Sequence, residues 1–143
     1  MTSNIIKLGE AATFINGYHF KPSDWSTKGL EIIRIQNLTG SSNETNFFEG
    51  ELNSKYSVVN GDLLISWSAT LGVFEWNTGN AWLNQHIFKV VFNKKEFDKR
   101  FFKHLISQVL SEMNRQVHGS TMKHITKDRF DNIKIPYPPL ETQ

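Results

Sequence analysis

A long run of helical periodicity near the carboxyl end constrains this sequence more than any other feature. Apolar residues recur there at four-residue steps, with a second apolar row alongside: Phe97, Phe101, Leu105, Val109 and Met113, then Phe102, Ile106 and Leu110. This spacing predicts an amphipathic helix over residues 95–116. From the first row, we expect Phe101, Leu105 and Val109 to lie in the core.

Most of the apolar segments before this helix are typical of strands. We predict strands at residues 31–36, 72–76 and 86–92, and a last strand at 133–135 after the helix. Asn60-Gly61 lies between two further apolar runs, and both residue types tolerate positive φ. We therefore predict a tight hairpin across residues 56–66, with Asp62 accepting backbone hydrogen bonds at the turn.

Two short helices are expected to flank these strands. Residues 8–15 place Leu8 and Ile15 on one helical face, and Gly17 suits the end of that helix. Thr126 is a suitable cap for a second short helix that runs to Phe130.

The order of these elements predicts the fold class. Strands come first and a long helix follows, which favours an α+β domain with an antiparallel or mixed β-sheet, a long amphipathic helix and short flanking helices. Strand and helix do not alternate, and the sequence has no glycine-rich phosphate loop, so a nucleotide-binding fold is excluded. Without repeats or linkers, residues 1–143 are expected to form one domain.

Composition excludes several classes of protein. The chain has no cysteine, which removes disulfide frameworks, cysteine zinc sites and cysteine nucleophiles. No apolar run approaches the roughly 18 residues of a membrane helix, and residues 1–4 do not resemble the start of a signal peptide. We therefore expect a cytoplasmic protein.

The charges are unevenly distributed along the chain. Residues 1–70 carry five Lys or Arg against seven acidic residues, for a net charge of −2. Residues 71–143 carry eleven against seven, for +4. A basic half suits a polyanionic partner, although a solvated helix face explains it equally well. The near-neutral total excludes a DNA mimic, which must be strongly acidic.

The residues that could support catalysis or metal binding do not form a recognisable set. The five histidines, His19, His86, His104, His118 and His124, lack the spacing of metal ligands on a helix. A Ser120–His124 nucleophile pair lacks a third orienting group and a strand-to-helix elbow. Residues 119–121 suit either a plain loop between helices or, with Lys123, a loop that contacts phosphate.

Aromatic and amide side chains offer weak signals for ligand binding. Trp67 could stack on a base or a sugar, but a tryptophan there more often packs across a sheet. Trp25 is harder to assign to a core, because it lies between Lys21 and Lys28 in a polar loop. Residues 84–86, Asn-Gln-His, could read adenine edges or build a turn.

Taken in order, these segments resemble the target-recognition domain of a type I restriction–modification specificity subunit. The matching pieces are Leu8-Gly9-Glu10, Gly17, Ile33-Arg34, Asn37, residues 61–66, residues 69–72, Asn84-Gln85-His86, Gly119-Ser120-Thr121, Ile125, Phe130 and residues 135–143. Asn-Gln-His before a strand and the terminal Ile-Pro-Tyr-Pro-Pro-Leu-Glu-Thr-Gln are together specific. The likeness covers nearly the whole chain.

The resemblance implies a DNA-binding module that performs no catalysis. In that family two such domains, joined by long helices, read the two halves of a split DNA sequence. Modification subunits carry the methyl donor and restriction subunits add ATP-dependent cleavage, so this chain is expected to bind double-stranded DNA and no cofactor or metal. The family's spacer helix would begin after Gln143, so we expect the chain alone to be monomeric.

The resemblance and the loop positions together suggest two sets of DNA contacts. Candidates for base reading are Lys21, Trp25, Lys28, Asn43, Asn46, Ser66, Trp67, Ser68, Thr70, Asn84, Gln85 and His86. Candidates for phosphate contact are Gly119, Ser120, Thr121, Lys123, His124, Lys127 and Arg129. Residues shared with the family are expected to be scaffold or phosphate contacts, because recognised sequences differ between members.

Two alternatives remain open at this point. One is the recognition domain of a single-chain restriction–methylation enzyme, which uses a similar module. The other is a β-rich carbohydrate-binding module with Trp25, Trp67 and Trp82 as stacking platforms, which would show no salt-dependent affinity for DNA.

Overall fold

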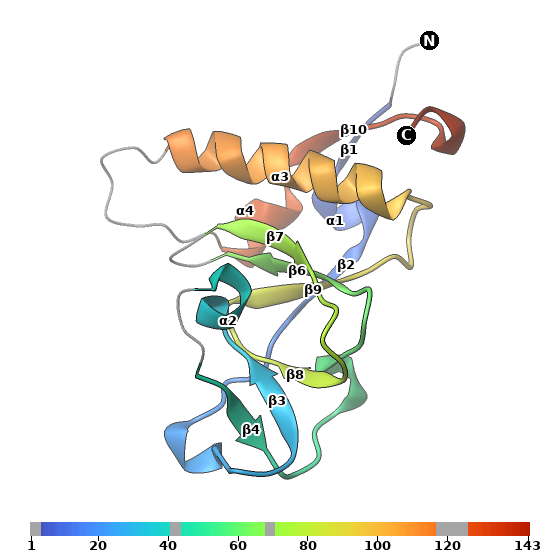
Figure 1. Cartoon of the computed structure of the whole chain (residues 1–143). Coiled ribbons are helices and arrows are strands. Elements are labelled where there is room, and N and C mark those ends of the chain that lie inside the picture. Colours follow the sequence, from blue (N-terminus) through green and yellow to red (C-terminus); the bar gives the residue numbers. More distant parts are fainter. Residues whose placement is uncertain (1–3, 41–43, 68–70, 117–125) are drawn as a thin grey trace.

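Two four-stranded sheets and one long helix make up most of the molecule (Figure 1). The computed structural model describes residues 4–40, 44–67, 71–116 and 126–143. Its mixed content of antiparallel and parallel strands, with a long helix and short flanking helices, confirms the α+β prediction.

The first sheet is antiparallel and lies under the long helix (Figure 1). Its strand order is β2 (Thr13–Asn16), β9 (Ile87–Val91), β6 (Leu63–Ser66) and β7 (Gly72–Glu75). Helix α3 (Lys99–Gln116) packs its apolar face on this sheet, which creates the largest buried cluster of the described chain.

The second sheet lies on the other side of the first, away from α3 (Figure 1). Its order is β4 (Asn46–Phe48), β3 (Leu30–Ile33), β8 (Ala81–Leu83) and β5 (Ser57–Val58). Strands β3 and β8 run parallel, while the other two pairs are antiparallel. Two smaller apolar clusters pack around this sheet.

Short elements complete the structure at both ends of the molecule. Strand β1 (Asn4–Lys7) pairs antiparallel with β10 (Lys134–Tyr137), so the first and last strands of the described chain lie together near α3 (Figure 1). The short helices are α1 (Leu8–Ala11), α2 (Ile35–Thr39) and α4 (Lys127–Asp131), with 3₁₀ turns η1 (Pro22–Asp24), η2 (Ser54–Tyr56) and η3 (Leu140–Thr142).

The predicted long helix is present, with a small change in its start and in its buried face. It begins at Lys99, because the Asp98 carboxylate accepts a hydrogen bond from the Phe101 backbone at 3.0 Å and caps the first turn. The fully buried line is Phe102, Ile106 and Leu110, while Leu105 is 8% exposed. Phe101 and Val109 are only half-buried, so the second apolar row and not the first forms the centre of the core.

Two predicted elements end earlier than their sequences suggested. Helix α1 stops at Ala11, and residues 13–16 form β2 because they pair with β9. The strand predicted over 31–36 stops at Ile33, because the Asn37 side chain accepts the Arg34 backbone N–H at 3.0 Å and starts helix α2. In both places a tertiary or side-chain contact overrides the local pattern.

The turn at Asn60-Gly61 is present, but the predicted hairpin is wrong. Gly61 has φ +93°, and the Asp62 carboxylate accepts the Val59 N–H at 2.9 Å, as expected for the turn. However, β5 pairs with β8, whereas β6 pairs with β7 and β9. The turn therefore carries the chain from one sheet to the other.

No helix among the described residues is long and apolar enough to cross a membrane.

Candidate nucleic-acid interface

The loop from Lys21 to Lys28 lies at the end of the molecule opposite α3 (Figure 1). It is ordered by short-range bonds: the Asp24 carboxylate accepts the Lys21 N–H at 2.8 Å, and the Ser26 hydroxyl accepts the Lys28 N–H at 3.2 Å. Lys21 and Lys28 are exposed, and Trp25 is 47% exposed. An exposed tryptophan between two lysines can contact a base or a groove wall and the neighbouring phosphates.

Strand β4 supports this loop from one side. The Ser26 N–H donates to the Phe47 carbonyl at 2.8 Å, and the Ser26 hydroxyl donates to the Glu49 carboxylate at 3.1 Å. Asn46, at the start of β4, is half-buried, and its amide nitrogen is buried without a hydrogen-bond partner in the described part of the chain. Its side chain is therefore turned inward, and only a rearrangement would let it reach a base.

The two sheets are joined where β2 ends and where β8 passes into β9. The Gly17 N–H donates to Ile87, the Tyr18 N–H donates to Leu83 at 2.8 Å, and the Gln85 N–H donates to Tyr18 at 2.9 Å. The predicted role of Gly17 as a helix terminator is wrong. A Cβ there would lie 1.8 Å from the Asn84 carbonyl oxygen, so Gly17 permits the close crossing of two backbones.

Asn16 is the polar centre of this junction. Its side-chain oxygen accepts hydrogen bonds from the Trp67 indole N–H at 3.1 Å and from the His86 backbone N–H at 3.2 Å. His86 has φ +72°, an unusual conformation for a residue with a side chain. Asn16 is not among the candidates predicted from sequence, because a single asparagine at the end of a short strand carries no distinctive signal.

Burial removes two residues from the base-reading candidates. Ser66 is fully buried, and Trp67 is 9% exposed with its ring stacked on Phe88 and its edge against His86. Neither side chain presents a free face to DNA. Asn84, Gln85 and His86 are half-buried at the crossing, where backbone hydrogen bonds join the two sheets. Base contacts by their side chains stay predictions.

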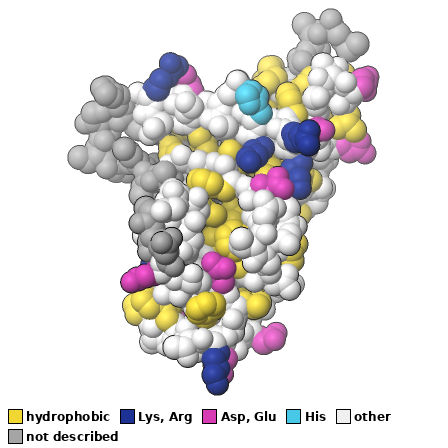
Figure 2. Space-filling view, in the orientation of Figure 1, with side chains coloured by type: hydrophobic (Ala, Val, Ile, Leu, Met, Phe, Trp, Pro, Cys, Tyr) yellow, Lys and Arg dark blue, Asp and Glu magenta, His cyan; other side chains and the backbone are white. Residues whose placement is uncertain are grey.

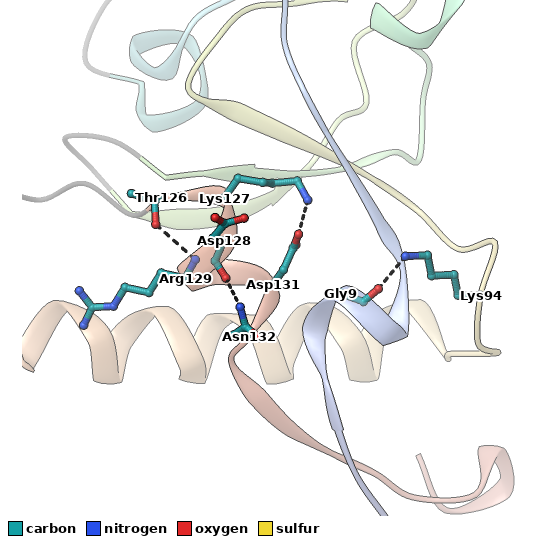
Figure 3. A network of polar contacts seen from close by, with 8 residues as sticks. All are labelled: Gly9, Lys94, Thr126, Lys127, Asp128, Arg129, Asp131 and Asn132. Atoms are coloured by element: carbon teal, nitrogen blue, oxygen red, sulfur yellow. Dashed lines mark hydrogen bonds and ion pairs between the residues drawn. The ribbon is translucent and has the colours of Figure 1, made fainter.

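Helix α4 holds the described part of the predicted phosphate-contacting segment. Thr126 caps it by accepting the Arg129 N–H at 3.2 Å, as predicted. Lys127 pairs with Asp131 at 2.5 Å, whereas the Arg129 side chain extends away from this pair (Figure 3). Arg129 also lines a groove of about 410 Å³ beside α3. Arg129 therefore presents the less compensated charge of the two candidates.

The remaining candidates lie outside the described residues. They are Asn43, Ser68, Thr70, Gly119, Ser120, Thr121, Lys123 and His124.

A further group of basic side chains lies outside the candidates predicted from sequence. Lys and Arg side chains gather over the amino-terminal half of α3, together with one histidine (Figure 2); they are Lys99, Arg100, Lys103 and His104. Lys99 lies 3.9 Å from Glu75, whereas Arg100 and Lys103 have no acidic partner in the described structure. Cations in a first helical turn oppose the helix dipole, which is a signal that the sequence could have given.

The charge of another groove argues against phosphate binding there. A groove of about 470 Å³ is lined by Glu31 and Glu75 together with Trp76 and Asn77, and no Lys or Arg is among the described residues that line it. Burial raises the pKa of the Glu31 carboxyl above its ordinary value of 4.5. Among the described residues, no three His, Cys, Asp or Glu side chains form a possible metal site.

Comparison with known proteins gives a consistent match over almost the whole chain. A family profile described as "Type I restriction modification DNA specificity domain" matches residues 2–143. The EcoBI specificity subunit of Escherichia coli is 28% identical over 140 residues, which cover 96% of this chain and 29% of that protein. The MjaVIII specificity subunit of Methanocaldococcus jannaschii is 24% identical over 154 residues, covering 97% and 36%.

The fold also matches a solved structure of this kind. The HsdS subunit from Thermoanaerobacter tengcongensis superposes with a TM-score of 0.71 at 20% identity, over 97% of this chain and 34% of that one. The chain thus spans about a third of the length of each relative.

Proposed function

The chain belongs to the type I restriction modification DNA specificity domain family, and we propose that it is one target-recognition domain that reads half of a split DNA sequence. The observation that carries this proposal is the exposed Lys21–Lys28 loop, held on the edge of a sheet in a chain that matches the family from end to end. A rigid scaffold that presents an aromatic and two cations on a loop is a suitable reading head.

Recognition on this account divides between two surfaces. Trp25, with Lys21 and Lys28, contacts base edges or the groove. Arg129, with Lys127 and the segment before α4, contacts phosphates and contributes affinity that does not depend on sequence. Arg129 supports this division because its side chain is exposed and extends away from the nearby ion pair (Figure 3).

The chemistry of the complex lies outside this chain in our proposal. The chain performs no catalysis and binds neither a methyl donor nor ATP, because those belong to modification and restriction subunits that assemble on a specificity subunit. In this proposal the complex works in the cytoplasm, and the chain by itself is expected to be a monomer. The two curated relatives are specificity subunits, which supports this division of labour between subunits over a single-chain restriction–methylation enzyme.

The carbohydrate-binding alternative loses its basis in the structure. It required three stacking platforms, but Trp67 is 9% and Trp82 is 7% exposed. Only Trp25 of the three presents a substantial surface, at 47%.

Titration of labelled duplex DNA at two salt concentrations tests the proposed function. For a duplex of arbitrary sequence we expect a Kd of roughly 10⁻⁴ to 10⁻⁶ M near physiological salt, and an affinity that falls as salt rises. A double variant, Lys127→Ala with Arg129→Ala, should weaken the salt dependence. Affinity that does not change with salt would contradict phosphate contact, and an absence of binding at low salt would contradict the function itself.

A further inference from the structure

We propose that Arg34 and Asn37 are positioning residues for DNA recognition, which fix the Lys21–Lys28 loop through strand β4. This role rests on the proposed function, and both residues lie outside the two sets of candidate DNA contacts. Their side chains converge on a single backbone atom, the carbonyl oxygen of Glu44. The Arg34 Nη2 donates to this oxygen at 3.0 Å, and the Asn37 Nδ2 donates to it at 2.8 Å.

Asn37 performs two separable tasks with the two ends of its amide. Its Oδ1 accepts the Arg34 backbone N–H at 3.0 Å and so starts helix α2. Its Nδ2 is then directed at Glu44. Starting the helix requires only the oxygen, so the amide nitrogen serves only the connection to Glu44.

Arg34 is placed at a cost that local stability does not explain. Its Nε is buried and has no hydrogen-bond partner in the described part of the chain. No carboxylate pairs with its guanidinium among those residues. Partial burial of a cation is energetically unfavourable when its main hydrogen-bond acceptor is a backbone carbonyl. Rules of local stability are most often broken where function requires a fixed geometry.

Strand β4 needs this connection because it is short and lies at a sheet edge. It has three residues and pairs with β3 through Ile32↔Asn46 and its neighbours. Glu44 lies two residues before the strand. The two side-chain donors therefore fix the entry to β4, where few ladder bonds hold it.

The exit and the open edge of β4 hold the reading loop. Phe47 accepts the Ser26 N–H at 2.8 Å, and Glu49 accepts the Ser26 hydroxyl at 3.1 Å. Ser26 directly follows Trp25 and supports the Lys28 N–H. A displacement of β4 at Glu44 would therefore reach Trp25 through Ser26.

The substitution Asn37→Asp separates the two tasks of this side chain. An aspartate keeps the oxygen that starts α2 and loses the donor to Glu44. Gln36→Ala is the matched control, because Gln36 is exposed on the same helix. Arg34→Met is the second variant, since it removes the other donor and the unpartnered Nε while keeping an apolar stem.

Two measurements on the 143-residue chain report directly on the loop. Acrylamide quenching reports mainly Trp25, because Trp67, Trp76 and Trp82 are at most 9% exposed. Hydrogen exchange at the Ser26 amide reports its bond to Phe47. We expect Asn37→Asp and Arg34→Met to raise both, while Gln36→Ala leaves both at the wild-type value.

Selection from a randomised duplex library then tests recognition. The wild-type chain should enrich a motif, and Asn37→Asp should lower the preference for that motif over a scrambled duplex by roughly fivefold, the effect of about one hydrogen bond. Affinity for the scrambled duplex should stay unchanged. Absence of any motif with the wild type would contradict the proposed function and this role with it. Unchanged quenching and exchange in both variants would contradict the positioning contact alone, and a moved loop with unchanged preference would contradict its role in recognition.

Discussion

Gly17 and Asn84 come so close that a Cβ atom on Gly17 would lie 1.8 Å from the Asn84 carbonyl oxygen. The substitution Gly17→Ala should therefore destabilise the fold by at least about 3 kcal/mol, because two backbones and not a flexible side chain would have to move. Urea unfolding measures this. Gly40→Ala is the control: Gly40 has φ +77°, but no atom of the described residues lies within 4 Å of the position of its Cβ, so we expect a loss of only about 1–2 kcal/mol. Equal losses would show that the close crossing is not the cause.

The buried face of α3 predicts a difference between adjacent phenylalanines. Phe102 is fully buried, whereas Phe101 is half-buried. Phe102→Ala should lower the free energy of unfolding by roughly 3–5 kcal/mol through lost burial and a cavity, and Phe101→Ala should lower it by clearly less. Urea denaturation of the two variants decides the helix phase, and the reverse order would mean that the helix is rotated.

How far the sequence predicts this fold depends on where each signal lies. The α3 periodicity and the Thr126 cap are local patterns, so both can be predicted from the sequence. Strand β2 cannot, because residues 13–16 become a strand only by pairing with β9, more than seventy positions away. Strands β4 and β8 have three residues each, too few for a period to be visible.

The same distinction holds for the candidate site. Trp25 was identified from its polar neighbours, since an isolated tryptophan between lysines has no local core to enter. Trp67 follows the apolar run of residues 63–65, so its sequence favours packing across a sheet. The residue that accepts its indole N–H, Asn16, is 51 positions away, so this partner could not be predicted from the local sequence.

Asn16 should be more important for stability than the solvent exposure of this residue suggests. Replacing Asn16 with Leu leaves the Trp67 indole and the His86 amide without their shared acceptor, and we expect a loss of roughly 1–3 kcal/mol. Asn16→Asp keeps an acceptor oxygen and should lose less. Thermal or urea unfolding measures the stability of both variants. An Asn16→Leu variant as stable as the wild type would mean that water replaces the acceptor.

Glu31 should make stability depend on pH in a known direction. Burial raises the pKa of its carboxyl in the folded state above 4.5. A raised folded pKa contributes stability that is present below the unfolded value and is lost as pH rises through the folded value. Glu31→Gln should therefore gain stability relative to the wild type as pH rises above 4.5. Urea unfolding from mildly acidic to neutral pH tests this, and a constant difference would contradict the assigned burial effect.

Arg129 should contribute more to the salt dependence of DNA binding than Lys127. Arg129→Ala should reduce the slope of log affinity against log salt by about one unit, because one phosphate contact is lost. Lys127→Ala should reduce it by less, since Lys127 pairs with Asp131 in the free protein. Arg115→Ala is the control for a change of net charge, because Arg115 pairs with Glu112 on α3. An equal effect of all three variants would indicate a general charge effect and no specific contact.

The most direct test of the reading-loop assignment compares Trp25→Ala with the wild type on two duplexes, the selected target and a scrambled sequence of the same length. Trp25 is exposed and tied to the fold chiefly through the neighbouring Ser26, so its removal should leave stability nearly unchanged. We expect affinity for the target to fall by about 1–3 kcal/mol while affinity for the scrambled duplex stays within twofold. If Trp25→Ala keeps the wild-type preference for the target, or loses affinity equally on both duplexes, the Lys21–Lys28 loop does not read the sequence.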